Sequence, residues 1–105
     1  MDNKFDKMAT VFKALSDSNR LMIVDMLLKG EMCACQILDE LNISQSTLSH
    51  HMKSLCEAGV VDGRKDGKWM FYSINNNCCK EAHALLTSII DAPDQSNVNE
   101  SCSCD

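Results

Sequence analysis

Apolar residues recur at spacings of three and four along the first half of the chain, which is the period of helices with one buried face. Ser16 is placed to cap a second helix, and Gly30 is placed to end it. A third helix is predicted over 34–41, then a tight turn over 42–44 and a fourth helix that Ser44 caps. The predicted inward positions of the four helices are Phe5, Met8, Phe12 and Leu15, then Leu21, Val24, Leu27 and Leu28, then Ile37, Leu38 and Leu41, and finally Leu48, Met52 and Leu55.

The period of the pattern changes after Gly59. A strand is expected to begin at 60–61, and Asp66-Gly67 is a strong hairpin-turn signal. The alternating residues 69–74 predict the returning strand. A closing helix ends shortly before Pro93, and its apolar stripe is Ala82, Leu85, Leu86, Ile89 and Ile90.

The predicted order is α-α-α-α-β-β-α, mainly α with one small β-hairpin. Two short helices joined by a tight turn and followed by a basic hairpin are typical of the winged helix-turn-helix fold. We expect one DNA-binding and dimerisation domain over 1–92 and a flexible, cysteine-containing tail over 93–105. The apolar stripes of the first and last helices exceed what a monomer of 105 residues easily covers, so a homodimer is expected.

Charge is distributed unevenly along the chain. The net charge is −5, but residues 45–74 hold four basic and three acidic side chains, while the remainder holds six basic and twelve acidic ones. With His50 and His51 added, this window is the stretch best suited to face phosphates. Neither a signal region nor a long apolar run is present, so the sequence predicts a cytoplasmic protein with no membrane partner.

The fourth helix carries short polar side chains on its predicted outer face, which is what a helix needs to read bases in the major groove. A solvated helix face would show the same pattern. The adjacent basic hairpin favours the DNA-reading alternative, because such a wing lies over neighbouring phosphates or the minor groove. The candidate DNA-binding residues are Gln45, Ser46, Thr47, Ser49, His50 and Lys53 on the helix and Arg64, Lys65 and Lys68 on the hairpin.

Cysteines are the second candidate chemistry, since an unexported chain with seven of them more often binds metal or reacts than forms structural disulfides. Cys33 and Cys35 sit at the start of the third helix, and thiolates select soft ions. Side chains at i and i+2 point about 200° apart on a regular helix. One ion can therefore bind both only if the first turn is distorted or Cys33 precedes the helix. The alternative is two small buried hydrophobic residues.

Several strings of the sequence closely resemble the ArsR/SmtB family of metal-responsive repressors, in particular the arsenical-resistance repressors of Gram-positive bacteria. The resemblance covers about Phe5 to Asp91 and implies a homodimer, paired through the first and last helices, that leaves a palindromic operator when an ion binds. The strings are Ser16-Asp17-Ser18-Asn19-Arg20-Leu21, Gly30-Glu31-Met32-Cys33-Ala34-Cys35, Ser44-Gln45-Ser46-Thr47-Leu48-Ser49-His50-His51-Met52-Lys53-Ser54-Leu55 and Arg64-Lys65-Asp66-Gly67-Lys68.

The resemblance also implies the inducer. Family members often carry Cys-x-Cys-x-x-Cys at this place, but Leu38 stands at the third position here, so Cys102 and Cys104 of the tail are the candidate further ligands. Three thiolates would suit As(III) or Sb(III), and four would suit Cd(II), Pb(II) or Zn(II). No permanent cofactor and no small organic substrate are expected.

Two other functions compete with a ligand-released repressor. A thiol redox regulator would oxidise Cys33 with Cys35, or Cys78 with Cys79. An enzyme with a cysteine nucleophile needs a partnered base, which the positions of the three histidines do not supply. Cys56 is expected to pack in the core, and His83 to lie on a helix surface or at an interface.

Overall fold

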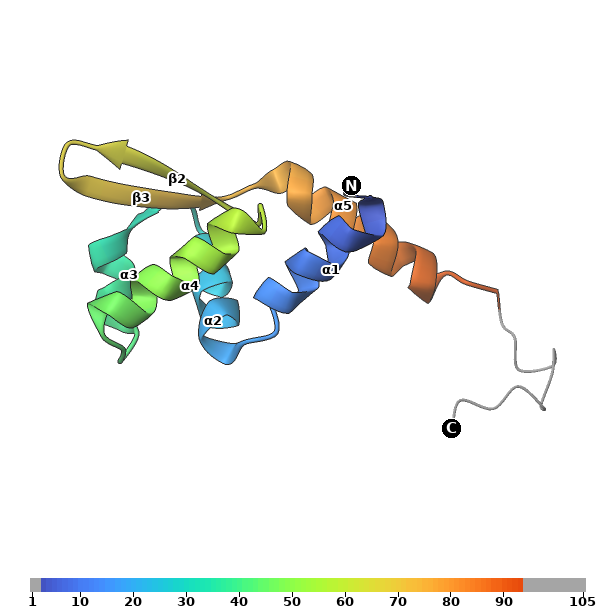
Figure 1. The fold of residues 1–105 in the computed structure, drawn as a ribbon, viewed down its shortest axis with the longest axis horizontal. Coiled ribbons are helices and arrows are strands. Elements are labelled where there is room, and N and C mark those ends of the chain that lie inside the picture. Colours follow the sequence, from blue (N-terminus) through green and yellow to red (C-terminus); the bar gives the residue numbers. More distant parts are fainter. Residues whose placement is uncertain (1–2, 94–105) are drawn as a thin grey trace.

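The computed structural model describes residues 3–93, and within them the predicted order of helices and hairpin is confirmed, with one strand added (Figure 1). The helices α3 and α4 lie with the hairpin at one end of the molecule, and α1 and α5 lie at the other. The elements are α1 (Lys4–Ala14), α2 (Ser18–Leu27), β1 (Met32–Cys33), α3 (Ala34–Glu40), α4 (Gln45–Glu57), β2 (Val61–Asp66), β3 (Trp69–Ile74) and α5 (Asn76–Ile90). This arrangement is a winged helix-turn-helix, in which α3 and α4 form the helix-turn-helix and β2–β3 the wing.

Side-chain caps set the helix boundaries. Asp17, not Ser16, caps α2, because its carboxylate accepts the backbone N–H of Arg20 at 3.1 Å. The Ser16 hydroxyl instead donates to the Lys13 carbonyl at the end of α1. Serine and aspartate are both favoured N-cap residues. The loop after α1 directs Ser16 back to that helix and leaves Asp17 to cap α2. Ser44 caps α4 as predicted, accepting from the N–H of Thr47.

The sheet has three antiparallel strands in the order β1-β3-β2. The predicted hairpin is present, with Asp66 paired to Trp69 and Gly67 at the first loop position. The φ of Gly67 is +64°, and the other loop residue has a negative φ, which fits a type II′ turn. The strand β1 was not predicted, because two residues that pair with β3 have no periodicity of their own. It places Cys33 opposite Phe71 of the wing.

The core lies where α2, α3, α4 and the base of the sheet meet, and Ile23, Ile37 and Leu55 are fully buried in it. The prediction for α2 was partly wrong. Leu27 is buried, but Leu21 and Leu28 are exposed. Apolar residues surround most of this helix, so periodicity alone does not select the inward face.

The helices α1 and α5 pack against each other, with an ion pair between Lys7 and Glu81 at 2.6 Å. Ala82 of α5 is buried, but the end of the helix is not covered within one chain. Leu86 is 45% exposed and Ile90 is 77% exposed. An apolar helix face of this kind marks a surface suited to pairing with another protein surface.

Candidate nucleic-acid interface and thiol site

The helix α4 presents the predicted polar face to solvent. Its inward residues Leu48, Met52 and Leu55 are buried in the core. All six candidate DNA-reading residues of this helix are exposed, and they are Gln45, Ser46, Thr47, Ser49, His50 and Lys53. A rigid helix with short polar side chains outward and an apolar stripe inward has the shape that enters a major groove.

His51 does not face solvent, contrary to the expectation that it would lie with His50 among the residues facing phosphates. Its side chain is buried, with an exposed fraction of 6%. Position 51 lies three residues after Leu48 and four before Leu55, so it belongs to the inward stripe of α4. That spacing was the signal in the sequence that could have identified it.

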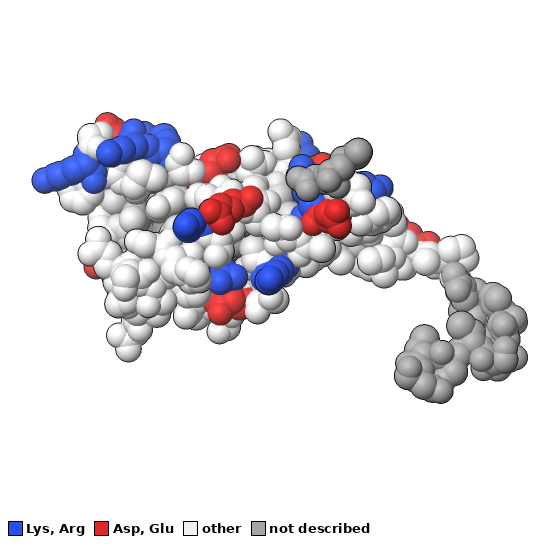
Figure 2. All heavy atoms as spheres, viewed as in Figure 1, with Lys and Arg blue, Asp and Glu red and all other residues white. Residues whose placement is uncertain are grey.

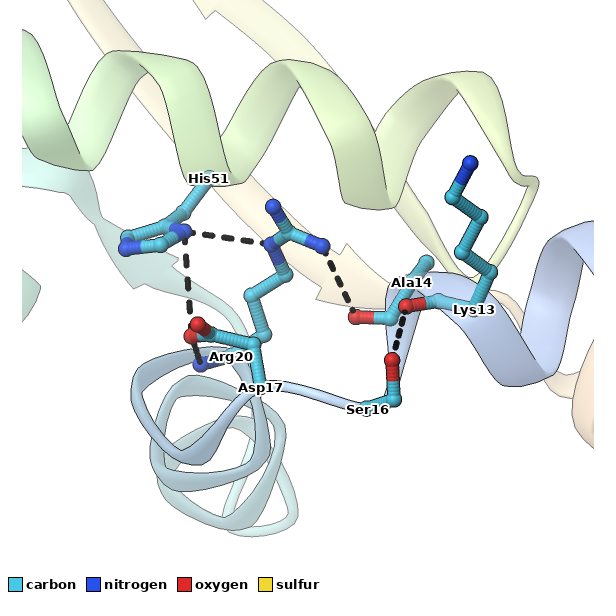
Figure 3. A network of polar contacts seen from close by, with 6 residues as sticks. All are labelled: Lys13, Ala14, Ser16, Asp17, Arg20 and His51. Carbon is cyan, nitrogen blue, oxygen red and sulfur yellow. Dashed lines mark hydrogen bonds and ion pairs between the residues drawn. The ribbon is translucent and has the colours of Figure 1, made fainter.

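The buried His51 anchors α4 to the neighbouring helices (Figure 3). The Nε–H of Arg20 donates to His51 Nδ1 at 3.1 Å, and the same guanidinium reaches the Ala14 carbonyl at 3.5 Å. The Asp17 carboxylate lies 3.9 Å from His51 Nδ1. Because Nδ1 accepts from Arg20, the neutral ring carries its proton on Nε2. Arg20 therefore joins the end of α1, the start of α2 and the inner face of α4.

The wing carries the positive charge predicted for it, and Figure 2 shows the basic side chains gathered over the hairpin. Lys65 and Lys68 are exposed. Arg64 is held differently, because its guanidinium donates to both Glu31 oxygens at 2.8 Å and stacks on Phe71 at 4.6 Å from the ring centroid. A bidentate pair of this type is strong and directional. Of the three wing residues, Arg64 is thus the least available to phosphate.

The thiols Cys33 and Cys35 are adjacent in space. Cys33 is buried and is the N-cap residue of α3, with extended backbone angles, whereas Cys35 is exposed in the first turn. Their sulfur atoms are 2.9 Å apart. Of the two arrangements that would let one ion bind both, the structure has the one in which Cys33 precedes the helix.

The hydrogen bond between the two thiols shifts their pKa values in opposite directions. The pKa of Cys33 is lowered, first because the Cys35 thiol donates to its sulfur and then because the backbone N–H of Cys35 does. The pKa of Cys35 is raised, chiefly because that same hydrogen bond holds its proton. Cys33 is therefore the thiol of the pair that deprotonates more readily, and the exposed Cys35 is the one that keeps its proton.

The pair fits a soft ion as two ligands. With metal–sulfur bonds of about 2.3 Å, two thiolates on a tetrahedral zinc lie roughly 3.8 Å apart, so these sulfurs would separate slightly on binding. Among residues 3–93 no cluster of three or more His, Cys, Asp or Glu side chains is arranged to hold a metal ion. The other two predicted ligands, Cys102 and Cys104, lie outside the described residues.

Both thiols open into a hollow of about 330 Å³ between α3, α4 and the wing. The same hollow is bordered by Gln45 and Ser49, two of the candidate DNA-reading residues, and by Lys68 of the wing. Its remaining lining is Ala34, Leu38, Leu48, Met52, Trp69, Met70 and Tyr72. The thiol pair and part of the candidate DNA-reading face of α4 therefore border one cavity.

Cys33 also connects the thiol pair to the wing and to α3. It pairs with Phe71 of the wing strand β3, and its N–H donates to the Gln36 side chain at 2.8 Å at the start of α3. Cys33 is thus held to the wing strand and to the first turn of α3 at the same time.

The other three cysteines within residues 3–93, and His83, do not line this hollow. Cys56 is partly buried and packs against the core, and burial is the main cause that raises the pKa of its thiol. Cys78 is buried and Cys79 partly buried at the start of α5, and burial raises the pKa of both thiols. His83 is exposed on α5.

Comparison with known proteins agrees with this architecture. Residues 17–62 match the family described as bacterial regulatory protein, arsR family. The chain is 44% identical to the arsenical resistance operon repressor of Staphylococcus aureus over 101 residues, covering 95% of this chain and 90% of that one. It is 50% identical over 66 residues to the cadmium resistance transcriptional regulatory protein CadC of Listeria innocua, covering 62% and 56%. The solution structure of a homodimeric winged helix-turn-helix DNA-binding domain from Mycobacterium bovis, a possible ArsR-family regulator, superposes with a TM-score of 0.68 at 30% identity, covering 83% and 81%.

The fold and its exposed polar helix define a winged helix-turn-helix regulator. The chain belongs to the arsR family of bacterial regulatory proteins, because the relationship to the Staphylococcus aureus protein extends over almost the whole of both sequences. Within residues 3–93, no helix combines the length and the apolar character needed to span a bilayer.

Proposed function

We propose that this protein is a homodimeric repressor that binds a palindromic operator and releases it when arsenite or antimonite binds to cysteine thiolates. The observation that carries this proposal is the adjacent pair Cys33 and Cys35, whose hollow is shared with residues of the reading helix and the wing. Similarity to the arsenical resistance operon repressor of Staphylococcus aureus supports arsenical resistance as the controlled function.

DNA binding is assigned to the exposed face of α4 and to the wing. Gln45, Ser49 and His50 would contact base edges or phosphates, and Lys53 with Lys65 and Lys68 would contact phosphates. Arg64 would contribute less, since Glu31 already neutralises its charge.

Dimerisation is assigned to α1 and α5. The exposed apolar end of α5, with Leu86, Ile89 and Ile90, supports this assignment, as does similarity to the homodimeric Mycobacterium bovis domain. A two-fold dimer places two identical reading helices on the DNA, which is why the operator would be a palindrome.

The further ligands are assigned to Cys102 and Cys104, and we infer that they act on the partner subunit's site. The end of α5 lies at the opposite end of the molecule from α3 (Figure 1). Cys102 lies nine positions after Pro93, and a chain of that length spans at most about 30 Å. Antiparallel pairing of two α5 helices would bring each tail towards the other subunit's thiol pair.

A second inducer class is favoured by one comparison. The cadmium-resistance relative supports a response to Cd(II), Pb(II) or Zn(II), for which Cys33, Cys35, Cys102 and Cys104 would supply four thiolates. This alternative uses the same residues and differs in how many of them the ion requires.

The test is release of the full-length protein from a fluorescent operator, followed by anisotropy under reducing conditions. Arsenite should release the wild type, and the Cys33→Ser/Cys35→Ser protein should repress equally well but hold DNA at the same arsenite concentrations. Reversal of occupancy from 99:1 to 1:99 requires the ion to favour the free form by about 5.5 kcal/mol. Multi-thiolate binding supplies energies of about 10–16 kcal/mol in structural zinc sites. Release of the double variant at wild-type arsenite concentrations would place the sensing site elsewhere, with Cys78 and Cys79 as the next candidates.

A further inference from the structure

The side chain of Arg64 crosses the sheet and is fixed at its far side. Arg64 lies in β2 opposite Phe71 of β3, and its guanidinium stacks on that ring at 4.6 Å from the centroid. β3 is the central strand, and Glu31 directly precedes β1 on its other side. The guanidinium reaches Glu31 and donates from Nε and Nη2 to the two carboxylate oxygens at 2.8 Å each. Arg64 therefore spans all three strands of the sheet.

The Glu31 carboxylate occupies the Arg64 guanidinium in the way that a DNA phosphate would. A planar guanidinium presents parallel N–H groups that match two carboxylate oxygens or two phosphate oxygens equally well. The pair lies at the surface, where the Arg64 side chain is 55% exposed and the Glu31 side chain 36% exposed. DNA lying on the wing would therefore meet an arginine whose fork is already filled. It would also meet the negative charge of the carboxylate, which repels phosphate.

The other candidate cations of the wing are not held in this way. Lys65 and Lys68 are exposed, and neither makes an ion pair with any side chain of residues 3–93. Arg64 also approaches Asp66, but through a single contact of 3.8 Å to a carboxylate that is 70% exposed. Glu31 is therefore the main competitor for the Arg64 guanidinium.

We propose that Glu31 competes with the DNA backbone for Arg64, holds its guanidinium away from phosphate, and so limits the affinity of this protein for DNA. The inference rests on the proposed function, because it requires the wing to contact DNA. It goes further in assigning control of DNA affinity to an acidic residue outside both the reading helix and the wing. A limit of this kind suits a repressor that must leave its operator, since weaker DNA binding lowers the free energy that the inducer has to supply.

The test compares the full-length wild type with Glu31→Gln by anisotropy of a labelled operator and of a scrambled duplex of the same length, without arsenite. Glutamine keeps the length of the side chain but removes its charge, so Arg64 becomes free to bind phosphate. Glu31→Gln should bind both duplexes more tightly than the wild type, because phosphate contacts carry no base information. Most substitutions at a protein–DNA interface weaken binding, so the sign of the effect is itself informative.

The salt dependence gives the magnitude. One new phosphate contact in each of the two wings of a homodimer should make the slope of log K against log salt concentration steeper by about 1.8. The gain in affinity of Glu31→Gln over the wild type should therefore be about 12-fold larger at 50 mM than at 200 mM salt. In an Arg64→Ala background, adding Glu31→Gln should leave the slope unchanged, because the guanidinium that gains the contact is absent.

The matched control is Glu40→Gln, which removes the same charge from an exposed position of α3. Glu40 makes no ion pair within the described part of the chain, so this variant should keep the wild-type slope. Glu31→Ala is a second variant of the competitor and should steepen the slope as Glu31→Gln does, so the test does not depend on one protein.

The inference is overturned if Glu31→Gln and Glu31→Ala both keep the wild-type slope, since the pair would then only brace the wing. It is also overturned if Glu31→Gln steepens the slope equally in the Arg64→Ala background, because the gain would then come from loss of general repulsion. Failure of the proposed function would look different. In that case the wild type would bind the operator no better than the scrambled duplex, or Lys65→Ala would also keep the wild-type slope.

Discussion

Replacement of Lys65 by alanine isolates the electrostatic contribution of the wing. Lys65 is exposed on β2, opposite Met70 of β3, and no ion pair engages it among residues 3–93. Its charge is therefore free to meet a phosphate. Arg64, its neighbour, is bound to Glu31 through two hydrogen bonds and provides a contrast within the same strand.

The magnitude follows from counterion release. Each neutralised phosphate contributes about −0.9 to the slope of log K against log salt concentration. A homodimer has two wings, so Lys65→Ala should reduce the steepness of the slope by about 1.8. Between 50 and 200 mM salt, the wild type should then lose about 12-fold more affinity than the variant does. Arg64→Ala should change the slope by clearly less, because its charge is already paired.

The assay is anisotropy of a labelled operator at several salt concentrations, with a scrambled duplex as the non-specific reference. Lys65→Ala should weaken binding to both duplexes, since phosphate contacts carry no base information. Lys80→Ala, on α5 outside the reading helix and the wing, is the matched control. If the Lys65→Ala protein shows the wild-type slope of log K against log salt concentration, the proposed contact between the wing and DNA is refuted. If Arg64→Ala changes this slope more than Lys65→Ala does, Glu31 does not keep Arg64 from phosphate.

Three other predictions address the dimer, the anchor of α4 and the thiol pair. Leu86→Asp should yield a monomer with poor operator affinity, and sedimentation of the wild type as a monomer at micromolar concentration would contradict the proposed interface. His51→Leu removes the hydrogen-bond acceptor of Arg20, so it should lower the free energy of unfolding, measured by urea denaturation, by about 2 kcal/mol. The control His50→Leu, at an exposed position of the same helix, should change this free energy little. The raised pKa of Cys35 keeps its thiol more protonated at pH 7.5 than an ordinary cysteine thiol. Cys33→Ala removes the sulfur that accepts this proton in a hydrogen bond, so iodoacetamide should alkylate Cys35 faster in that variant. Unchanged alkylation rates, measured on peptides by mass spectrometry, would mean that the hydrogen bond does not control this pKa.

Local patterns in the sequence were sufficient wherever the deciding interactions lie close along the chain. The stripe Leu48, Met52 and Leu55 placed the polar face of α4 outward, because helical period alone relates these positions. Asp66-Gly67 located the hairpin, because the turn needs a residue that tolerates positive φ. The start of α3 at Cys33 and Cys35 was also correctly placed.

Interactions between distant residues were decided only by the tertiary structure. Glu31 and Arg64 are 33 positions apart, and Arg20 and His51 are 31 apart, so no local period indicates either pair. The two-residue strand β1 exists only because β3 pairs with it, and that pairing holds Cys33 outside the regular turn of α3. The sequence by itself identified which thiols and which helix to consider. Their meeting at one hollow depends on how the wing folds back over α3 and α4, because packing between elements sets those distances and helical or strand period does not.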